Sequence, residues 1–420
     1  MYKLNTYCRA CGTPTAPGTK SPATAKLRSV FNLGLQPLAN DFCKEEDERA
    51  GYAPLEVLLC PRCFLAQLSV TVDPAVLYEH YLYVTSPSKT MHGHFESLLK
   101  RIRGVDGCKI LEIGCNDGAF LKFLKGDGYS VMGVDPALNQ VRKAADAGIP
   151  AYCGYWGSDL VRSNTGVSQF KPDFIFARHV FCHVEDWRDF IKGLEMVTGD
   201  ETRIFIEVPY VQDLLDRAEF DTIYHEHSSY LSIQAMEALL HPTGLDLIEV
   251  ERLNIHGGAL LLTLARKGTP TGLSVPQMLA KEDCGQKAWD EFAVKSHAKI
   301  ETVRDFVRTQ RSLGKRVVGY GASAKSTVWI NACGFTRKDI EFIADATPEK
   351  QYRFSPGSDI PILPEGLLTG ELSDYAICFA WNFFDEIRRK EKIFLERGGK
   401  WIIPHPEMKV VGAEELCQVT

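Results

Sequence analysis

The sequence contains no long hydrophobic run, and its charges are neither strongly imbalanced nor gathered into blocks of one sign. The longest apolar stretches, such as Ala259 to Leu262, fall far short of the ~18 residues that a membrane-spanning helix requires. Lys and Arg total 48 against 54 Asp and Glu, so the formal net charge is −6, and no basic cluster indicates nucleic-acid binding. We therefore expect neither a membrane nor a nucleic acid as a partner.

The first residues, MYKLNTYCRACG, lack the apolar segment of a secretory signal, so a cytoplasmic location is expected. In that compartment the 13 cysteines should be thiols or metal ligands rather than disulfides. Hydrophobic residues make up 45% of the chain and charged residues 24%, which is typical of a globular protein and excludes a disordered chain or a disulfide scaffold. At roughly 150 residues per domain, the length of 420 residues predicts about three domains.

The cysteines mark the first of these domains. Five of them fall within the first 63 residues, among them the pairs Cys8-x2-Cys11 and Cys60-x2-Cys63. Four thiolates at this spacing suit a closed tetrahedral zinc site with Zn–S distances near ~2.3 Å. Because four protein ligands leave no open position, we predict that the zinc is structural. The fifth thiol, Cys43, is expected to lie in the core.

The middle of the chain, from about Leu77 to Arg266, alternates short apolar runs with longer amphipathic stretches. This alternation is typical of strand–helix units on a parallel sheet. The strands are expected at residues 109–113, 130–134, 174–177, 203–208, 245–252 and 259–266. The last two flank a His-Gly-Gly turn, so they should pair as an antiparallel hairpin.

The last third of the chain begins with a segment rich in Gly and Pro, residues 267–276. Apolar residues at helical spacing from Trp289 to Val307 follow it, which predicts a linker and then a long connecting helix. A second series of short apolar runs extends from Lys315 to Pro404 and predicts a smaller doubly wound unit. The fold class is therefore α/β, with mostly parallel sheets.

A glycine-rich turn, LEIGCNDG at residues 111–118, follows the first expected strand, and Asp135 ends the second. A carboxylate ~20 residues beyond such a turn can bind a ribose hydroxyl, so the ligand should contain a nucleoside. A dinucleotide would bring phosphate to the turn, where Asn116 and Asp117 add bulk and negative charge. The acidic turn is better suited to S-adenosylmethionine, whose sulfonium is cationic.

A cluster of ionisable side chains lies in YHEHSSYLS, residues 224–232, and His183 follows the third strand. Together they supply a base of near-neutral pKa, a carboxylate to orient it, and phenol or imidazole donors for an oxyanion. The spacing of His225 and His227 differs from the His-x3-His pattern of zinc hydrolases, which disfavours a metal at this cluster.

A second glycine-rich turn, GYGASAK at residues 319–325, has Asp345 at the end of the following strand. Taken alone, this G-x-G-x-x-A pattern favours a dinucleotide. The diphosphate of a nucleotide-linked substrate would also suit the glycine amides and Lys325. A purely structural turn is the third interpretation, and the sequence alone does not choose among them.

Taken in order, these pieces resemble the cobalamin-independent, S-adenosylmethionine-dependent sugar C-methyltransferases, which act on nucleotide-linked 4-keto-6-deoxy sugars. The resemblance rests on the four cysteines of the two pairs, the segment 81–88 (YLYVTSPS), the turn 112–118, the cluster 224–232, His256-Gly257-Gly258 and Gly319-Tyr-Gly321-Ala. It implies a zinc-binding domain at residues 1–75, a methyltransferase domain at 76–268, a linker and connecting helix at 269–310, and a C-terminal Rossmann-like domain that binds the nucleotide sugar at 311–420.

The resemblance also implies the roles of individual residues. His227 would remove the proton from C3 of the sugar, with Tyr224, Glu226 and His183 as the other catalytic residues. The implied cofactor residues are Tyr81, Ser88, Gly114, Asn116, Asp117, Gly118, Asp135 and His179, and the implied substrate residues are Tyr83, Tyr230, His256, Gly321 and Lys325. His225 and Pro87 depart from the family pattern at positions that could alter which sugar fits.

The expected reaction places strict demands on the site. A C–H carbon is not a nucleophile, so methylation at C3 requires the neighbouring C4 carbonyl to acidify that proton and to accept charge as an enolate. We therefore expect a dTDP-linked keto sugar as substrate, S-adenosylmethionine and structural Zn²⁺ as cofactors, and a monomer or homodimer. The alternatives are an O- or N-methyltransferase, which needs no oxyanion donor, and an NAD-dependent oxidoreductase that uses residues 319–325.

Overall fold

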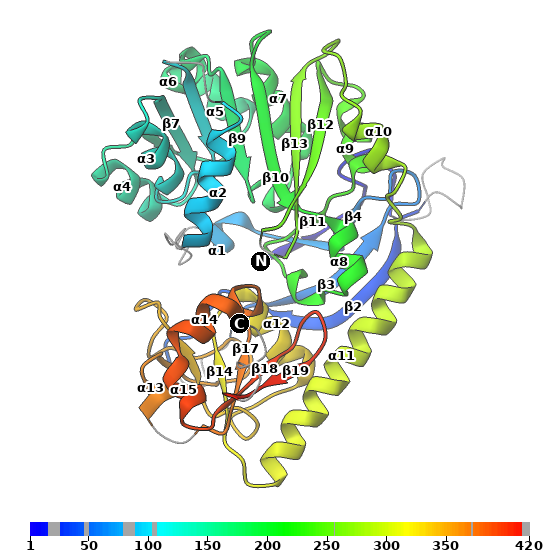
Figure 1. Cartoon of the computed structure of the whole chain (residues 1–420). Coiled ribbons are helices and arrows are strands. Elements are labelled where there is room, and N and C mark those ends of the chain that lie inside the picture. The colour runs from blue at the N-terminus through cyan, green and yellow to red at the C-terminus, as the bar shows by residue number, and fades with distance from the viewer. Residues whose placement is uncertain are drawn as a thin grey trace.

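The computed structural model describes residues 1–15, 26–45, 50–78, 89–102, 107–255, 257–370 and 373–413. A larger and a smaller α/β unit lie one above the other, and strands of the N-terminal segment lie between them (Figure 1). The long helix α11 (Gln286–Ser312) runs along one side and leads from the larger unit to the smaller one (Figure 1). The fold class is confirmed as α/β.

The larger sheet has the strand order β12-β13-β10-β9-β6-β7-β8. Its strands are β6 (Lys109–Ile113), β7 (Ser130–Asp135), β8 (Ala151–Cys153), β9 (Phe174–Arg178), β10 (Arg203–Pro209), β12 (Leu245–Leu253) and β13 (Ala259–Arg266). All the strands predicted here are present, and β12 and β13 pair antiparallel as expected. The turn between them needs glycine, since Gly258 has a φ of 123° and an added Cβ would lie 2.4 Å from Asp213 Oδ2.

Helices pack on both faces of this sheet because each βα unit returns the chain across it (Figure 1). They are α2 (Lys89–Leu99), α3 (Ala119–Gly126), α4 (Leu138–Asp146), α5 (Ser158–Ser163), α6 (Thr165–Phe170), α7 (Trp187–Val197), α9 (Ile233–Leu240) and α10 (Ser274–Leu279). The apolar stripe of α7 illustrates the reason, since Trp187, Phe190 and Leu194 are buried in the core at helical spacing. Helix α8 (Val211–Arg217) instead packs with the N-terminal strands, since Val211 and Leu214 share a buried cluster with Leu55 of β3 (Tyr52–Leu59).

The smaller sheet has the order β16-β15-β14-β17-β18-β19, parallel except for β19. Its strands are β14 (Val317–Tyr320), β15 (Ile343–Asp345), β16 (Ile362–Pro364), β17 (Tyr375–Cys378), β18 (Lys400–Ile403) and β19 (Lys409–Val411). The accompanying helices are α12 (Ala324–Cys333), α13 (Leu367–Gly370), α14 (Phe384–Lys390) and α15 (Lys392–Glu396). The predicted doubly wound unit therefore forms, with β16 and β19 as additions to it.

The N-terminal segment forms small antiparallel sheets. β1 (Tyr2–Leu4) pairs with β5 (Val70–Val72), and the order β11-β4-β3-β2 joins β2 (Arg28–Pro37), β3 (Tyr52–Leu59) and β4 (Ala66–Leu68) to β11 (Ser229–Tyr230). A short helix, α1 (Pro74–Tyr78), follows β5. Because β11 comes from the middle of the chain, the N-terminal sheet and the segment with the His/Glu/Tyr cluster form one continuous structure.

The connecting helix α11 was predicted from its apolar spacing, and Trp289, Phe292, Ile300, Val303 and Val307 are all buried along it. Its ring contacts include an edge-to-face pair of Phe292 with Phe31 of β2, with ring centroids 5.0 Å apart. The helix thus packs on the N-terminal sheet. Among the described residues, no helix combines the length and the apolar character that crossing a membrane would need.

Candidate active site

The N-terminal segment with β1 to β5 and α1 is called the N-terminal lobe below. A cavity of about 600 Å³ opens where this lobe, the larger unit and the smaller unit meet. Many of the residues predicted for the site line it, namely Gly114, Asn116, Asp135, His179, His183, Tyr224, Glu226, His227 and Lys325. Asp117, Gly118, Tyr230 and Gly321 do not line it, and their predicted roles stay predictions. Tyr81, Tyr83, Ser88 and His256 lie outside the described residues.

The first glycine turn is shaped by backbone bonds to one carboxylate. Asp135 at the end of β7 accepts the amide of Asn116 on Oδ2 at 2.8 Å and the amide of Ala137 on Oδ1 at 2.9 Å. Gly114 has a φ of 72°, and a Cβ there would lie 2.9 Å from the side chain of Val180. The turn therefore approaches the next βα connection closely, and it leaves backbone and a buried carboxylate facing the cavity.

A buried ion pair lies beneath this turn. Arg178 donates from Nε and Nη2 to Oε1 of Glu112, at 3.0 and 2.6 Å. Burial raises the pKa of Glu112 to about 7, although Arg178 lowers it. Within the described part of the chain Glu112 Oε2 has no hydrogen-bond partner. Arg178 lines the cavity, and the sequence reasoning missed it because a charged residue at a strand end carries no motif of its own.

The strongest geometric feature is a phenol–imidazole pair. His227 Nδ1 lies 2.8 Å from the carbonyl oxygen of Thr222, which can only accept, so Nδ1 carries the proton. The lone pair of Nε2 then accepts the hydroxyl of Tyr224 at 2.7 Å. Burial lowers the pKa of His227 well below its usual value, with a further contribution from His183. The imidazole is thus neutral at physiological pH, as a general base must be.

A second imidazole faces the first. The ring centroids of His183 and His227 lie 5.2 Å apart, and His183 is the last residue of the short 3₁₀ helix η1 (Phe181–His183). Burial, together with His179, lowers the pKa of His183 to about 3. On its other side His183 stacks on Tyr78 of α1, with centroids 5.9 Å apart. Both imidazoles are therefore uncharged and can exchange hydrogen bonds with a bound substrate.

The N-terminal lobe contributes side chains that the sequence did not reveal. Asn40 donates from Nδ2 to Glu226 Oε1 at 2.6 Å, and the Tyr78 hydroxyl donates to the Glu226 carbonyl at 3.4 Å. Both Asn40 and Tyr78 line the cavity. No local pattern could have identified them, because the strand pairing with β11 is what brings them to the cluster.

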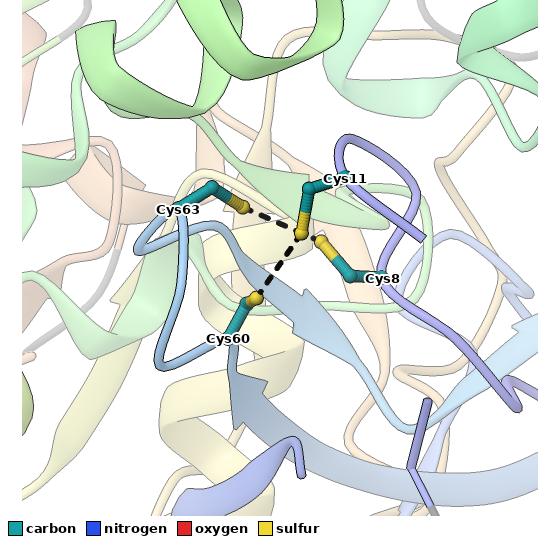
Figure 2. Close-up of side chains that lie close together, drawn as sticks. All are labelled: Cys8, Cys11, Cys60 and Cys63. Carbon is teal, nitrogen blue, oxygen red and sulfur yellow. Dashed lines mark hydrogen bonds between the residues drawn. The ribbon is translucent and has the colours of Figure 1, made fainter. Parts of the chain in front are cut away.

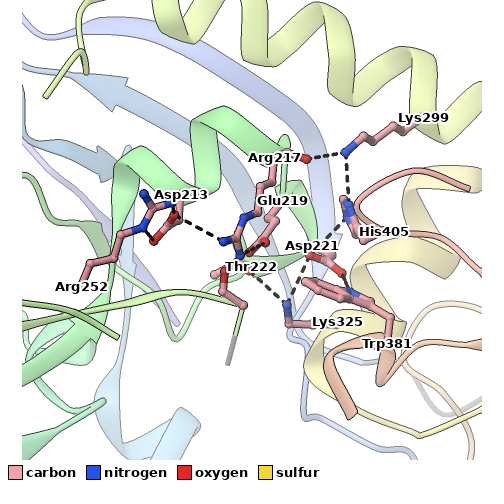
Figure 3. A network of polar contacts seen from close by, with 11 residues as sticks. Asp213, Arg217, Glu219, Asp221, Thr222, Arg252, Lys299, Lys325, Trp381 and His405 are labelled. Atoms are coloured by element: carbon pink, nitrogen blue, oxygen red, sulfur yellow. Dashed lines mark hydrogen bonds and ion pairs between the residues drawn. The ribbon is translucent and has the colours of Figure 1, made fainter. Parts of the chain in front are cut away.

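The smaller unit supplies cationic groups to the opposite wall. Lys325, near the start of α12, has its Nζ 3.6 Å from Asp221 Oδ1 and 4.3 Å from the centroid of the Trp381 ring. The fully buried Asp221 accepts the indole N–H groups of Trp329 and Trp381 on Oδ2. Figure 3 shows Lys325 and Trp381 meeting Asp221, which belongs to the 3₁₀ helix η2 (Phe220–Thr222) of the larger unit. This network joins the two units beside the cavity.

The second glycine turn has the same construction as the first. Asp345 at the end of β15 accepts the amide of Ala322 on Oδ2 at 2.6 Å and that of Thr347 on Oδ1 at 2.8 Å. Ser323 then caps α12 through a reciprocal pair of bonds with Ser326. The cavity reaches this turn at Ser323, and the half-buried Lys350 also lines it.

The predicted metal ligands come together. Cys8, Cys11, Cys60 and Cys63 converge from two loops, and their sulfur atoms lie within 4.8 Å of one another (Figure 2). The Cys8–Cys63 and Cys11–Cys60 Sγ distances of 3.5 Å exclude disulfides, whose S–S bond is ~2.05 Å. Tetrahedral Zn–S bonds of ~2.3 Å separate the sulfurs by about 3.8 Å. The donor set therefore fits a closed zinc site.

His225 plays a different part from its neighbour. Its Nε2 lies 3.2 Å from the carbonyl oxygen of Ala53 in β3, and the side chain does not line the cavity. A metal held jointly by His225 and His227 is therefore not supported. Burial lowers the pKa of His225 from 6.5 to about 4. As the pH falls, His225 therefore binds a proton at a higher pH in the unfolded chain than in the folded one.

We expect His225→Asn to flatten the pH dependence of stability. Burial of the neutral imidazole makes its full contribution to the free energy of unfolding above pH 6.5. This contribution is lost as the pH falls from 6.5 toward 4, by about 1.4 kcal/mol per pH unit. The variant should lose roughly 1–3 kcal/mol at pH 7.5 and lack this slope. Urea unfolding at several pH values measures both, and contributions from other buried histidines cancel in the comparison. Equal slopes in the two proteins would contradict the assignment.

Comparisons with known proteins identify the family of the chain. The chain matches three family descriptions: "Putative zinc binding domain" at residues 20–78, "Methyltransferase domain" at 88–250 and "C-methyltransferase C-terminal domain" at 254–406. It is 34% identical over 400 residues to the C-methyltransferase NovU of Streptomyces niveus, covering 92% of this chain and 94% of that protein.

Two solved structures of other proteins each align with less than half of the chain. The PH0226 protein of Pyrococcus horikoshii aligns with a TM-score of 0.36 and 16% identity, covering 47% of this chain and 97% of that one. Magnesium protoporphyrin IX methyltransferase of Synechocystis, solved with bound S-adenosylmethionine, aligns with a TM-score of 0.32 and 13% identity, covering 43% and 79% of the two chains.

Proposed function

Because the chain belongs to the S-adenosylmethionine-dependent C-methyltransferases, we propose that it methylates C3 of a nucleotide-linked 4-keto-6-deoxy sugar, with dTDP as the nucleotide. The observation that carries the proposal is the Tyr224–His227 pair in the cavity. A neutral base is what carbon methylation requires, because the C–H bond must be broken before a methyl group can be accepted.

A proton must leave C3 of the sugar before that carbon can accept a methyl group. His227 Nε2 would accept the C3 proton. The Tyr224 hydroxyl, which donates to this nitrogen, would either relay the proton from C3 to Nε2 or rotate away to expose Nε2 to C3. The C–H electron pair would become the C3–C4 double bond as the π pair of the C4 carbonyl moves onto its oxygen, which gives an enolate. His183, uncharged and facing His227, would donate a hydrogen bond to that oxygen. General-base catalysis of this kind contributes on the order of 10²–10⁴-fold, and one oxyanion donor about 3–4 kcal/mol.

The residues around the first glycine turn fit the methyl donor. Gly114 brings backbone to the cavity wall, and Asn116 and Asp135 line the wall beside it. When bound there, S-adenosylmethionine supplies an electrophilic methyl group on a cationic sulfonium. The buried carboxylate of Asp135 suits a ribose hydroxyl, since both its oxygens also have lone pairs beyond the amide bonds they accept.

The opposite wall suits the nucleotide diphosphate. Lys325 and Lys350 are cations that line the cavity, and the Ser323 turn lies beside them. Lys350 donates to the Ala322 carbonyl at 2.7 Å, so its ammonium is fixed at this turn. Binding the sugar between these lysines and the imidazoles would place C3 within reach of both the base and the donor, and orientation of this kind can supply ~7–11 kcal/mol.

Solvent exchange tests the proposal directly. In D₂O, with the keto sugar present and the methyl donor absent, the enzyme should exchange the C3 proton for deuterium, which mass spectrometry and NMR detect. With the donor added, the new methyl group should appear on carbon. A product methylated on oxygen or nitrogen, formed without C3 exchange, would show that the enzyme is the O- or N-methyltransferase considered as the alternative.

A further inference from the structure

The buried side chain of Arg9 links the cysteine site to the catalytic cluster. Arg9 lies between the ligands Cys8 and Cys11 and is only 6% exposed. Its guanidinium donates from Nη1 to the carbonyl of Ser228 and, at 2.7 Å, to Ser229 Oγ. Its Nη2 donates to Thr71 Oγ1, also at 2.7 Å. The arginine of the first cysteine loop thus binds the residue that follows His227.

The guanidinium of Arg9 is a cation in a buried position. The side-chain hydrogen bonds of Arg9 all go to neutral oxygens, and within the described ranges no carboxylate lies at ion-pair distance from it, so that Glu185 acts on its charge only from farther away. A buried cation without a carboxylate in contact with it is unfavourable unless other negative charge nearby compensates for it. Zn²⁺ held by four thiolates has a net charge of roughly −2. The loaded cysteine site would therefore stabilise the buried guanidinium beside it.

The segment that Arg9 binds is fixed from several sides. The Ser228 carbonyl also accepts the amide of Leu68 at 3.1 Å, where β11 joins β4. The Ser228 hydroxyl donates to the carbonyl of Cys182 at 3.0 Å, next to His183. A shift of Ser228 would therefore displace His227, which precedes it in the chain. It would also displace His183, because the Ser228 hydroxyl is bonded to the adjacent Cys182.

We propose that Arg9 is a positioning residue that couples the metal site to the catalytic segment. The tetrathiolate site fixes the loop that carries Arg9, the guanidinium holds the carbonyl of Ser228, and His227 keeps its orientation toward the cavity. This inference rests on the function proposed above for His227. It gives the metal site a role in catalysis although its ligands lie outside the cavity.

The principal test compares Arg9→Gln with Arg62→Gln. Arg62 occupies the second cysteine loop, between Cys60 and Cys63, and its side chain is exposed, so it is the matched control. We expect Arg9→Gln to keep its zinc and its affinity for S-adenosylmethionine but to lose up to ~10²-fold in kcat, with KM for the sugar little changed. Hydrogen exchange should become faster at the amides of residues 226–231 and stay unchanged in the smaller sheet. Arg9→Lys, which keeps the charge but can serve fewer acceptors, should recover part of the activity.

Equal kcat and equal hydrogen exchange in Arg9→Gln and Arg62→Gln would overturn the proposal. Should Arg9→Gln fail to fold, the wild-type enzyme decides: removing zinc with a chelator should speed exchange at residues 226–231, and unchanged protection there would overturn the coupling. The two proposals fail separately, because absence of C3 exchange in the wild type contradicts the proposed function alone, whereas the coupling is measured by amide exchange and zinc content without any sugar.

Discussion

His227→Ala is expected to abolish C3–deuterium exchange and to lower kcat for methyl transfer by about 10²–10⁴-fold. The reason is that Nε2 carries the basic lone pair of the imidazole, since Nδ1 donates its proton to the Thr222 carbonyl. Binding of S-adenosylmethionine, measured by calorimetry, should be unchanged because the cofactor turn lies on other elements. The exchange rate in D₂O and single-turnover methyl transfer measure the two effects.

Two further variants make this result specific. His241 is exposed after α9, away from the cavity, so His241→Ala should behave as the wild type. Tyr224→Phe removes the hydrogen bond to Nε2 but leaves the imidazole, and it should reduce the exchange rate less than His227→Ala does. Full C3 exchange in His227→Ala would assign the base to another residue.

Cys60→Ser is expected to have the largest effect on stability. Structural zinc sites contribute apparent binding free energies of ~10–16 kcal/mol in small domains, and removing one thiolate opens the tetrahedral site. The variant should lose most of its zinc, and its N-terminal lobe should unfold before the rest of the chain. Metal analysis and calorimetric unfolding measure these changes.

Unfolding of the lobe should also inactivate the enzyme, because β4 pairs with β11, which begins two residues after His227, the proposed base. Cys153→Ser is the control, since Cys153 is an exposed free thiol outside the ligand set. Wild-type zinc content, unfolding temperature and activity in Cys60→Ser would contradict both the ligand assignment and the dependence of the cluster on this lobe.

Much of the fold was predictable because its signals are local. The apolar runs that became β6 and β14, and the glycine turns after them, follow from residue periodicity and from backbone conformations that only glycine adopts easily. The Cys-x2-Cys pairs predicted a metal site for the same reason, since each pair is a short loop of fixed chemistry. β11 was missed, as a strand of two residues has no periodicity to detect.

The candidate site was predictable only in part. His227 and Lys325 lie in recognisable segments, and the structure brings them to one cavity. Asn40, Tyr78 and Arg178 also line that cavity, yet none belongs to a motif. They reach it because strands and helices remote in the chain pack together, so their contribution depends on contacts that no spacing along the sequence encodes.

By itself, the sequence determined the kinds of elements, the positions of the glycine turns and the chemistry available at each. Those properties depend on neighbours within a few residues, through backbone sterics and the side-chain period of helices and strands. Only the tertiary structure decided that the N-terminal lobe supplies the strand β4 and the side chain of Arg9 to the segment after His227. That contact joins residues more than 200 positions apart, and it exists because burying both surfaces together is more favourable than exposing either to water.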